Sequence, residues 1–406
     1  MRYVTPAIER LFREEKRMAL VAGPRQVGKT TLAQSLLEKV GASSNCFNWD
    51  NDTHRRAIVK NPESFWVTAG GGHGPSGRVR VALDEIHKYP RWKRFLKGLF
   101  DVHGRELELL VTGSGRLDIY QKGGDSLFGR YALYRLHPFT LGELLRADRA
   151  SVIPPETFWK SVLERSPLAG ASKGLLMLER FSGFPEPLFA GSEALFRRWK
   201  QEHHRLIIRE DLRDLTRIRE IGLIENLLML LPERIGSPLS INSLREDLNV
   251  AFDTAQNWLQ TLERLYYLFE IRPYAQRMAR ALRREGKVYF YDFTEVETLG
   301  PRFENLVAVH LRKLVDAWND CGYGDFELHY VRNKEKKETD FLISESRKPY
   351  ALIETKLSAG TVDPSLVYFQ ERLKPRYAIQ VLREGIHPRR QGALWLLPAH
   401  QFLAWI

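Results

Sequence analysis

Residues 18–40, MALVAGPRQVGKTTLAQSLLEKV, decide the fold of the first part of this chain. The apolar run MALVA predicts a strand, and the amphipathic residues after the loop predict a helix that follows at once. Between them, residues 23–30 fit the pattern GxxxxGK[ST] in the strand–loop–helix context that the pattern requires. In such a loop the backbone N–H groups curl around phosphate oxygens, and the helix N-terminus adds its positive dipole end. The stretch predicts a nucleoside triphosphate site; the alternative is a chance match in a glycine-rich turn.

Each polar residue of this loop has a chemical role in the prediction. Lys29 can reach the terminal phosphates, and the Thr30 hydroxyl can bind Mg²⁺. The predicted cofactors are therefore ATP and Mg²⁺. The residues expected to bind the nucleotide here are Gly23, Pro24, Arg25, Gln26, Val27, Gly28, Lys29, Thr30 and Thr31.

Two further apolar runs predict strands that complete this site. The run RVRVALDEIHKYP (78–90) brings Asp84 and Glu85 to the carboxyl end of a strand, where open α/β sheets bind ligands. Asp84 would join the Mg²⁺ shell, and Glu85 would orient or deprotonate the attacking water. The alternative is a surface acidic pair that opens the next helix. The run ELELLVTGSGRL (106–117) ends in Thr112, Gly113 and Ser114, so Thr112 is a candidate γ-phosphate sensor, or part of a plain turn.

Composition narrows the classes of protein. The chain has 406 residues, enough for two to four domains, and a formal charge of +12, which favours nucleic acid first and an anionic membrane surface second. The alternative is an ordinary basic soluble protein. The two cysteines, Cys46 and Cys321, exclude a disulfide scaffold and a cysteine-cluster zinc site. With no signal-peptide pattern and no apolar run of membrane-spanning length, we expect a cytoplasmic protein with no membrane partner.

The chain resembles a family of bacterial and archaeal AAA-type P-loop ATPases that carry a C-terminal domain of unknown function. The resemblance rests first on GPRQVGKTTL, LDEIHKYPRWKRFLKGLFD and LLVTGSGRLD. It continues through LFGRYALYRLHPFTLGELL, FSGFPEPLF, IIREDLRDLTRI, VYFYDF, FENLVAVHLRKL, ETDFLI and LWLLPAHQFL. It implies ATP binding and hydrolysis. ATPases of this class complete their site with an arginine from a neighbouring subunit or a lid, for which Arg130 and Arg209 are candidates; a neighbouring subunit would imply a homo-oligomer.

The stretch 238–274 has the pattern of a helix-turn-helix. Ser240 is expected to cap a short helix, LNVAF to make a tight turn, and a second helix to start near Asp253. On that helix, the residues expected to face inward are Ala255, Leu259, Leu262 and Tyr266, and those expected to face outward are Asp253, Gln256, Asn257 and Gln260. The basic residues expected to contact phosphates in the following wing are Arg272, Arg277, Arg280, Arg283, Arg284 and Lys287.

This pattern predicts a nucleic-acid partner, with DNA as the first candidate, bound with weak sequence specificity. No Arg or Lys on the exposed face of the second helix is placed to read guanine. The alternative is a module that docks proteins, which the carboxylate of Asp253 favours because it repels phosphates.

The stretch KKETDFLISESRKPYALIETKLS (336–358) predicts two strands joined by a turn, with charges at their ends. Together with Glu304 on a preceding helix, Asp340, Glu354 and Lys356 follow the order E…D…ExK, and Glu354 and Lys356 share a face because they are two apart on a strand. The pattern resembles the PD-(D/E)xK nuclease superfamily, with Thr339 where its name has proline. It implies metal ligands at Glu304, Asp340 and Glu354, and a catalytic Lys356. The alternatives are a structural ion pair, or a DNA-backbone clamp without metal.

The predicted fold class is α/β, with a parallel P-loop sheet and a C-terminal domain similar to restriction endonucleases. We expect an ATPase domain at 1–140, a helical lid or linker at 141–235, a winged helix-turn-helix at 236–293 and a nuclease-like domain at 294–406. The leading hypothesis is a Mg²⁺-dependent ATPase that binds nucleic acid and carries a nuclease-like domain. The alternative is an ATP-switched signalling or scaffold protein with an inactive nuclease fold.

Overall fold

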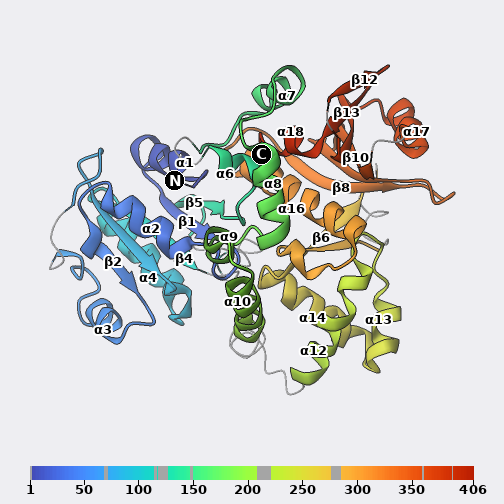
Figure 1. The fold of residues 1–406 in the computed structure, drawn as a ribbon. Helices are drawn as coiled ribbons and strands as arrows, with labels where there is room; N and C mark the ends of the chain where they lie inside the picture. Colours follow the sequence, from blue (N-terminus) through green and yellow to red (C-terminus); the bar gives the residue numbers. More distant parts are fainter. Residues whose placement is uncertain are drawn as a thin grey trace. The chain divides into compact units, whose positions relative to one another are not determined.

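The apolar run of residues 18–22 forms strand β1 (Met18–Ala22), and all five residues are buried. In this computed structural model β1 lies between two parallel neighbours in a five-stranded sheet of order β2-β3-β4-β1-β5 (Figure 1). The other strands are β2 (Cys46–Asn48), β3 (Val79–Asp84), β4 (Leu107–Gly113) and β5 (Tyr131–Arg135), and every pairing in the sheet is parallel. The predicted α/β class with a parallel sheet is confirmed.

The structure describes residues 2–406 except 68–71, 114–116, 118–126, 147–149, 208–220, 276–284, 359–360 and 386. The chain divides into two compact units. Unit 1 comprises Met1–His137 and Ala147–Val152, and unit 2 comprises Pro138–Arg146 and Ile153–Ile406. The helices of unit 1 are α1 (Thr5–Arg10), α2 (Lys29–Glu38), α3 (Asp52–Lys60) and α4 (Trp92–His103).

Unit 1 buries a charged network beside its apolar core. The Arg80 side chain on β3 is fully buried and its guanidinium contacts Glu9 and Glu108, each at 2.8 Å. It also donates to the Leu36 carbonyl at 3.0 Å. Because a buried guanidinium is tolerated only when it is paired and hydrogen-bonded, this network fixes α1 and α2 against the sheet.

Unit 2 is built on a mixed sheet of order β12-β13-β11-β10-β9-β8-β6-β7. Its strands are β6 (Leu268–Pro273), β7 (Lys287–Phe290), β8 (Phe326–Arg332), β9 (Glu338–Glu345), β10 (Lys348–Ser358), β11 (Tyr377–Glu384), β12 (Arg389–Gln391) and β13 (Leu394–Pro398). As predicted, β9 and β10 form an antiparallel pair joined by a turn. The hairpin β6–β7 joins the sheet through two parallel pairs, Arg272 with His329 and Pro273 with Tyr330.

The helices of unit 2 are α6 (Leu141–Leu145), α7 (Pro155–Glu164), α8 (Ala171–Phe181), α9 (Pro185–Ala190), α10 (Glu193–Leu206), α12 (Ile221–Leu230), α13 (Ile241–Leu248), α14 (Phe252–Arg264), α16 (Leu299–Asp320), α17 (Pro364–Leu373) and α18 (Ala399–Leu403). The sequence suggests residues 141–235 as a lid or linker on the ATPase core, but the described residues of 141–146 and 153–235 group by their contacts with unit 2. In the described part of the chain, no helix is both long enough and apolar enough to span a membrane.

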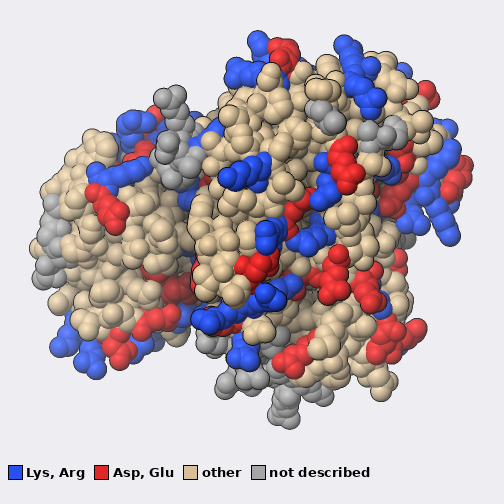
Figure 2. All heavy atoms as spheres, viewed as in Figure 1, with Lys and Arg blue, Asp and Glu red and all other residues tan. Residues whose placement is uncertain are grey.

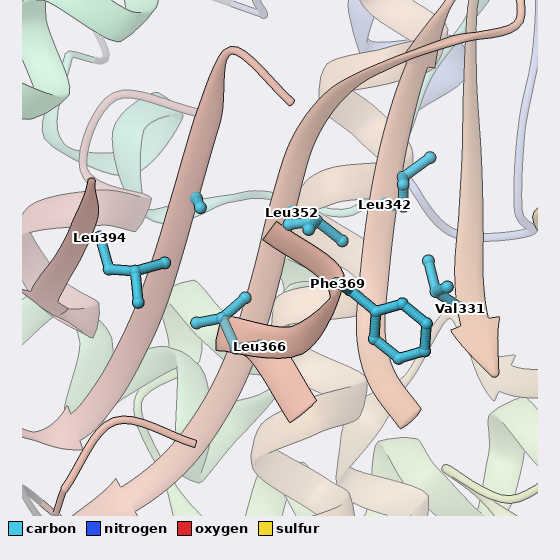
Figure 3. Close-up of a cluster of buried hydrophobic side chains, with 7 residues drawn as sticks. Val331, Leu342, Leu352, Leu366, Phe369 and Leu394 are labelled. Atoms are coloured by element: carbon cyan, nitrogen blue, oxygen red, sulfur yellow. The ribbon is translucent and has the colours of Figure 1, made fainter. Parts of the chain in front are cut away.

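Alternation along β9 and β10 gives this sheet two apolar faces. Leu342 and Leu352 pair in register and pack against Leu366 and Phe369 of α17 (Figure 3). Their chain neighbours Phe341, Ile343, Ala351 and Ile353 are also fully buried and point to the opposite face, because successive strand residues alternate. Helix α16 packs on β7 through β10, so both faces of these strands are covered. This double cover fixes the register of β9 and β10, and with it the positions of the acids at their ends.

The stretch 238–274 forms the expected pair of helices followed by a strand. The Ser240 side chain caps α13 by accepting from the Ser243 N–H, and Asn249 takes the left-handed conformation in the turn, with φ 53°. Helix α14 runs from Phe252 to Arg264, and the four residues expected to face inward are all buried. Three of them lie on the helix as predicted, whereas Tyr266 lies beyond its end, in the left-handed conformation with φ 56°. This region therefore folds as the helical pattern predicts.

Candidate functional sites

The loop between β1 and α2 is tightly curled. Gly28 ends it with φ 95°, a conformation that favours glycine, and a Cβ at Gly23 would lie only 2.2 Å from the Leu136 carbonyl oxygen. The Lys29 ammonium, 7% exposed, donates to the carbonyls of Gly23 at 3.0 Å and Pro24 at 2.7 Å. The loop is thus wrapped around its own lysine, at the carboxyl edge of the sheet. A terminal phosphate in the loop would offer this lysine a better, charged acceptor.

Asp84 lies at the edge of the sheet where β2, β3 and β4 end, and its carboxylate accepts hydrogen bonds from α2, β2 and β4. Its Oδ2 accepts from the Thr30 hydroxyl at 2.8 Å and from the Asn48 amide at 3.0 Å, and its Oδ1 accepts from the Thr112 hydroxyl. Asp84 is 1% exposed, whereas Thr30 is exposed. A hydroxyl and a carboxylate in contact at a phosphate-binding loop are the donor set that Mg²⁺ prefers, so these two residues fit the predicted ion.

Glu85 follows Asp84 in a strained backbone conformation. Its φ of 55° lies in the left-handed region, which costs a non-glycine residue about 1 kcal/mol. The carboxylate lies 3.5 Å from the Lys88 ammonium and 3.7 Å from His87 Nε2, and it keeps 24% of its surface exposed. The turn therefore presents Glu85 at the sheet edge, beside Asp84, with part of its carboxylate open to solvent.

Two residues of this site were not predicted from the sequence. The buried Arg2 guanidinium donates to the Val27 carbonyl at 2.7 Å and to the His137 carbonyl, so it pins the phosphate-binding loop to the segment after β5. Asn48 orients Asp84 from the end of β2. Arg2 stands in an ordinary N-terminal stretch, and only the fold brings it to the loop. Asn48 had a faint signal, because it is a polar residue at the end of a short strand.

Arg130 does not lie at the phosphate-binding loop of its own chain. The register pairs Met18 with Tyr131 and Ala22 with Arg135, so Arg130 precedes β5 at the amino edge of the sheet, opposite the loop. Its guanidinium instead forms an ion pair with Asp101 at 2.6 Å. The prediction is therefore wrong if Arg130 is taken to complete the ATP site of its own chain. That Arg130 completes the site of a neighbouring subunit stays a prediction. Arg209 and Ser114 lie outside the described residues.

A second cluster of charges forms in unit 2; we call it the carboxylate centre, made of Glu304, Glu338, Asp340 and Glu354. Glu304 comes from α16, Glu338 and Asp340 from β9, and Glu354 from β10. The Asp340 N–H donates to Glu354 Oε2 at 3.2 Å, and Asp340 Oδ2 accepts from both the N–H and the hydroxyl of Thr355. The fold thus brings the three acids of the predicted E…D…ExK constellation together.

Lys356 lies at the rim of this centre. Its ammonium is 2.8 Å from Glu354 Oε1 and 3.0 Å from Asp363 Oδ2, and 41% of the side chain is exposed. The contact with Glu354 agrees with the expected shared strand face. Burial lowers the pKa of Lys356, but the hydrogen bonds and charges of Glu354 and Asp363 outweigh it and raise the pKa. Lys356 is therefore a fixed cation in this arrangement.

Lys287 occupies the interior of the carboxylate centre. The side chain is 1% exposed, and its ammonium lies 2.7 Å from Glu338, 3.2 Å from Glu304 and 4.0 Å from Asp340. The expectation that Lys287 contacts phosphates as a wing residue is wrong, because the β6–β7 hairpin turns it into the core. Arg272 of the same wing forms an ion pair with Glu270 at 3.0 Å, and the other four arginines lie outside the described residues.

Burial and the closeness of like charges shift the pKa values of residues in this centre. Burial first, and then the nearby Asp340, raise the pKa of Glu304 to about 7, although Lys287 and the Tyr289 hydroxyl at 2.6 Å act the other way. The same two causes raise the pKa of Glu354. Burial lowers the pKa of Lys287, but Glu304, Asp340 and Glu338 outweigh it and raise the pKa, so this lysine stays charged. Within the described ranges, no three His, Cys, Asp or Glu side chains are arranged to hold a metal ion.

The exposed side of α14 faces a groove of about 430 Å³ against the β6–β7 hairpin. Its lining includes the acids Glu263, Glu270 and Glu285 and the amides Gln256 and Gln260, with Arg272 as the basic member. On the face shown in Figure 2, acidic side chains gather over α13 and α14, where Glu246, Asp247 and Asp253 are exposed. The predicted reading face is therefore more acidic than the sequence pattern indicated.

Three family models match the chain in succession. Residues 15–145 match an AAA domain. Residues 178–296 and 299–402 match two domains of unknown function, DUF8612 and DUF4143. The AAA match covers the parallel sheet and the phosphate-binding loop. Unit 1 therefore carries an AAA-type P-loop ATPase domain.

Relatives among known proteins are distant. The chain is 22% identical over 357 residues to the uncharacterized proteins Mb2031c of Mycobacterium bovis and Rv2008c of Mycobacterium tuberculosis, covering 86% of this chain and 72% of each relative. Among solved structures it is similar to the Orc1 protein of Aeropyrum pernix in complex with DNA, with a TM-score of 0.30 and 15% identity over 75% of this chain and 90% of that one. It is also similar to AMPPCP-bound DnaA from Aquifex aeolicus, with a TM-score of 0.25 and 13% identity over 64% of this chain and 87% of that one.

Proposed function

We propose that this protein is a Mg²⁺-dependent ATPase whose active site is the loop between β1 and α2. The observation that carries the proposal is the 2.8 Å hydrogen bond between the Thr30 hydroxyl and the Asp84 carboxylate. These are the two groups that would hold the ion on the triphosphate, and Asn48 and Thr112 keep the carboxylate turned toward Thr30. When bound there, the ion supplies positive charge that neutralises the phosphate oxygens.

Residues of the chain itself would bind the terminal phosphates and orient the attacking water. Lys29 would leave the loop carbonyls for the terminal phosphates, to which an ammonium donates charge-assisted hydrogen bonds. Glu85 would orient the attacking water, since its carboxylate is partly open at the same sheet edge. Its strained backbone fits that role, because strain of this kind gathers at active sites.

The test is ATP turnover by the full chain with Mg²⁺, compared with Lys29→Ala and Glu85→Gln. We expect Lys29→Ala to lose nucleotide binding, and Glu85→Gln to bind ATP while turning it over at least about a hundredfold more slowly. A Lys29→Ala protein that hydrolyses ATP like the wild type would overturn the proposal. Turnover is to be measured with and without DNA, because a partner can stimulate it.

We further propose nucleic acid, with DNA first, as the partner of unit 2, bound through contacts with the phosphate backbone and with weak sequence specificity. The supporting charge lies around the nuclease-like part rather than on α14. Its exposed basic residues include Lys334, Lys336, Lys337, Arg347, Lys348, Arg372, Lys374, Arg376, Arg389 and Arg390. Figure 2 shows basic side chains near β12 and at the right-hand edge of unit 2.

The salt dependence of binding tests this partner. Fluorescence anisotropy with a labelled duplex should give an affinity that falls steeply between low and moderate salt. A double substitution, Arg389→Ala with Arg390→Ala on β12, should reduce both the affinity and the salt slope. No affinity at low salt would favour the second candidate, an ATP-switched protein that binds other proteins. The acidic groove beside α14 is the observation in favour of that candidate, because its carboxylates repel phosphates.

A further inference from the structure

Lys287 lies where a divalent cation would lie in a nuclease of this design. Three carboxylates, from α16 and from two positions of β9, converge on its ammonium at 2.7, 3.2 and 4.0 Å. Metal-dependent centres gather carboxylates in this way because a cation must offset their repulsion. In this protein the cation is the ammonium group of Lys287 itself.

An ammonium and a metal ion cannot share this space. Mg²⁺ needs oxygen ligands at about 2.0–2.1 Å, and carboxylates that already surround a lysine ammonium at hydrogen-bond distance leave no room for it. Lys287 has no free path outward, because it is 1% exposed, its strand β7 is buried at every residue, and its ammonium lies 5.5 Å from the Tyr330 ring centre. Tyr289, two residues further along the same strand, also donates its hydroxyl to Glu304.

We propose that Lys287 takes the place of the catalytic metal ion, so that the carboxylate centre binds neither Mg²⁺ nor Mn²⁺ and does not cleave nucleic acid. The same contacts fasten the β6–β7 hairpin, which follows the helix-turn-helix, to α16 and β9. The acids and the lysine of the order E…D…ExK then serve the assembly of unit 2 rather than hydrolysis. This inference is independent of ATP turnover in unit 1.

Lys356 does not change this conclusion. Its ammonium is held by Glu354 and Asp363, at the rim of the centre, and not by Glu304 or Glu338. The acids of the centre therefore contact one interior cation, Lys287, and two outer cations, Lys356 at Glu354 and Arg332 at Glu338, where Nη1 lies 2.9 Å from Oε2. A metal ion bound by Glu304 and Asp340 would have to displace Lys287, and one bound by Glu354 would have to displace Lys356.

The experiment removes the positive charge of Lys287 and measures whether a metal ion binds in its place. Lys287→Met keeps the side chain as far as the ε carbon and deletes the ammonium, so the position of the ammonium is left open. The matched control is Lys313→Met, because the Lys313 side chain is also buried, at 4% exposed, and its ammonium contacts the Glu143 carboxylate at 2.8 Å and the Thr140 hydroxyl. Thermal unfolding of the full chain is measured with and without millimolar Mn²⁺, without nucleotide, for wild type and both variants.

We expect both variants to melt at a lower temperature than wild type, since each leaves a buried carboxylate unpaired. Mn²⁺ should raise the melting temperature of Lys287→Met by about 5 °C, and leave wild type and Lys313→Met unchanged. A Lys287→Met protein that folds but gains nothing from Mn²⁺ would overturn the claim that the ammonium stands in a cation position.

A second experiment measures metal binding directly, in proteins that keep Lys287. Mn²⁺ binding is titrated by electron paramagnetic resonance for wild type and Asp340→Asn. We expect both to bind the same number of ions. If wild type binds one more ion than Asp340→Asn, the centre holds a metal despite Lys287, and the proposal is overturned. A plasmid-nicking assay with Mn²⁺ on the same two proteins should show equal, background cleavage.

Discussion

The hydroxyl of Thr30 donates a hydrogen bond of 2.8 Å to Oδ2 of Asp84, which lies 54 residues further along the chain. Thr30 lies in the first turn of α2 and Asp84 ends β3, so the contact exists only because parallel strands bring their carboxyl ends to one edge. It joins the phosphate-binding loop to the acid that would complete the ion's shell.

Lys29→Ala should abolish ATP binding, because it removes the loop's cation. We expect nucleotide affinity to fall by at least about a hundredfold, as measured by titration with a fluorescent ATP analogue. The matched control is Lys60→Ala, an exposed lysine at the end of α3 that should leave affinity unchanged. Equal losses in the two variants would point to a general charge effect rather than to a phosphate site.

Thr112→Val should slow ATP hydrolysis while leaving ATP affinity near the wild-type value. The substitution keeps the shape of a side chain that is fully buried, but it removes the hydrogen bond that orients Asp84. An unsatisfied buried carboxylate oxygen costs about 1–3 kcal/mol, which corresponds to a loss of roughly tenfold or more in kcat. If affinity fell and kcat did not, Thr112 would act on the bound ground state, as a phosphate sensor does.

Arg2→Met should loosen the phosphate-binding loop. The substitution keeps much of the aliphatic packing but removes the hydrogen bonds to the carbonyls of Val27 and His137. We expect unit 1 to lose about 2 kcal/mol of stability and ATP to bind more weakly, as read by denaturant unfolding and by titration. Saturating ATP should restore part of the lost melting temperature, since a bound ligand stabilises the folded state. A variant with normal ATP affinity would show that Arg2 serves only the fold.

Arg130→Ala should leave ATP turnover of the dilute protein within about twofold of wild type. Arg130 lies at the amino edge of its own sheet, paired with Asp101, and the ATP loop lies at the carboxyl edge. Turnover is to be measured over a range of protein concentrations, with Asp101→Ala as the control that removes the same ion pair. A loss of about a thousandfold in Arg130→Ala alone would mean that this arginine completes the site of a neighbouring subunit.

Unit 2 should lose stability in acid through His310. Its Nδ1 lies 2.8 Å from the Leu306 carbonyl and its Nε2 accepts from the Leu141 N–H at 3.1 Å, so the buried ring is neutral. Burial, helped by nearby Lys313, lowers the pKa of His310 to about 3. Because the unfolded state then binds more protons below pH 6.5, the free energy of unfolding falls by about 1.4 kcal/mol per pH unit as the pH drops from 6.5.

His310→Gln isolates this contribution. Wild type should lose about 2 kcal/mol more than the variant between pH 7 and pH 5, as measured by denaturant unfolding at both values. The variant is less stable than wild type at pH 7, so the change with pH is compared and not the absolute value. Parallel pH profiles for the two proteins would show that the ring is not held neutral in the folded state.

Local pattern was enough for much of this protein. The strand β1, the loop with Lys29 and Thr30, and the helix after it are adjacent in sequence, so glycine positions and apolar periodicity report them directly. The same holds for the cap at Ser240 and for the buried face of α14, which depend on neighbours within a few residues. Asp84 was predicted because a polar residue at the end of a buried strand indicates that this residue lies at the edge of the sheet.

Local patterns in the sequence predict the α/β class, the nucleotide loop and the list of acids that meet in unit 2. Which cations those acids contact depends on how distant segments of the chain fold together. Lys287 looked like one more basic wing residue, but the pairing of β6 with β8 turns it toward Glu304 and Glu338, which lie 17 and 51 positions away. In the same way, strand register removed Arg130 from the loop, and the fold of the N-terminus brought Arg2 to it. Local pattern reports which residues are buried, whereas the partner of a buried charge is set by contacts between distant segments.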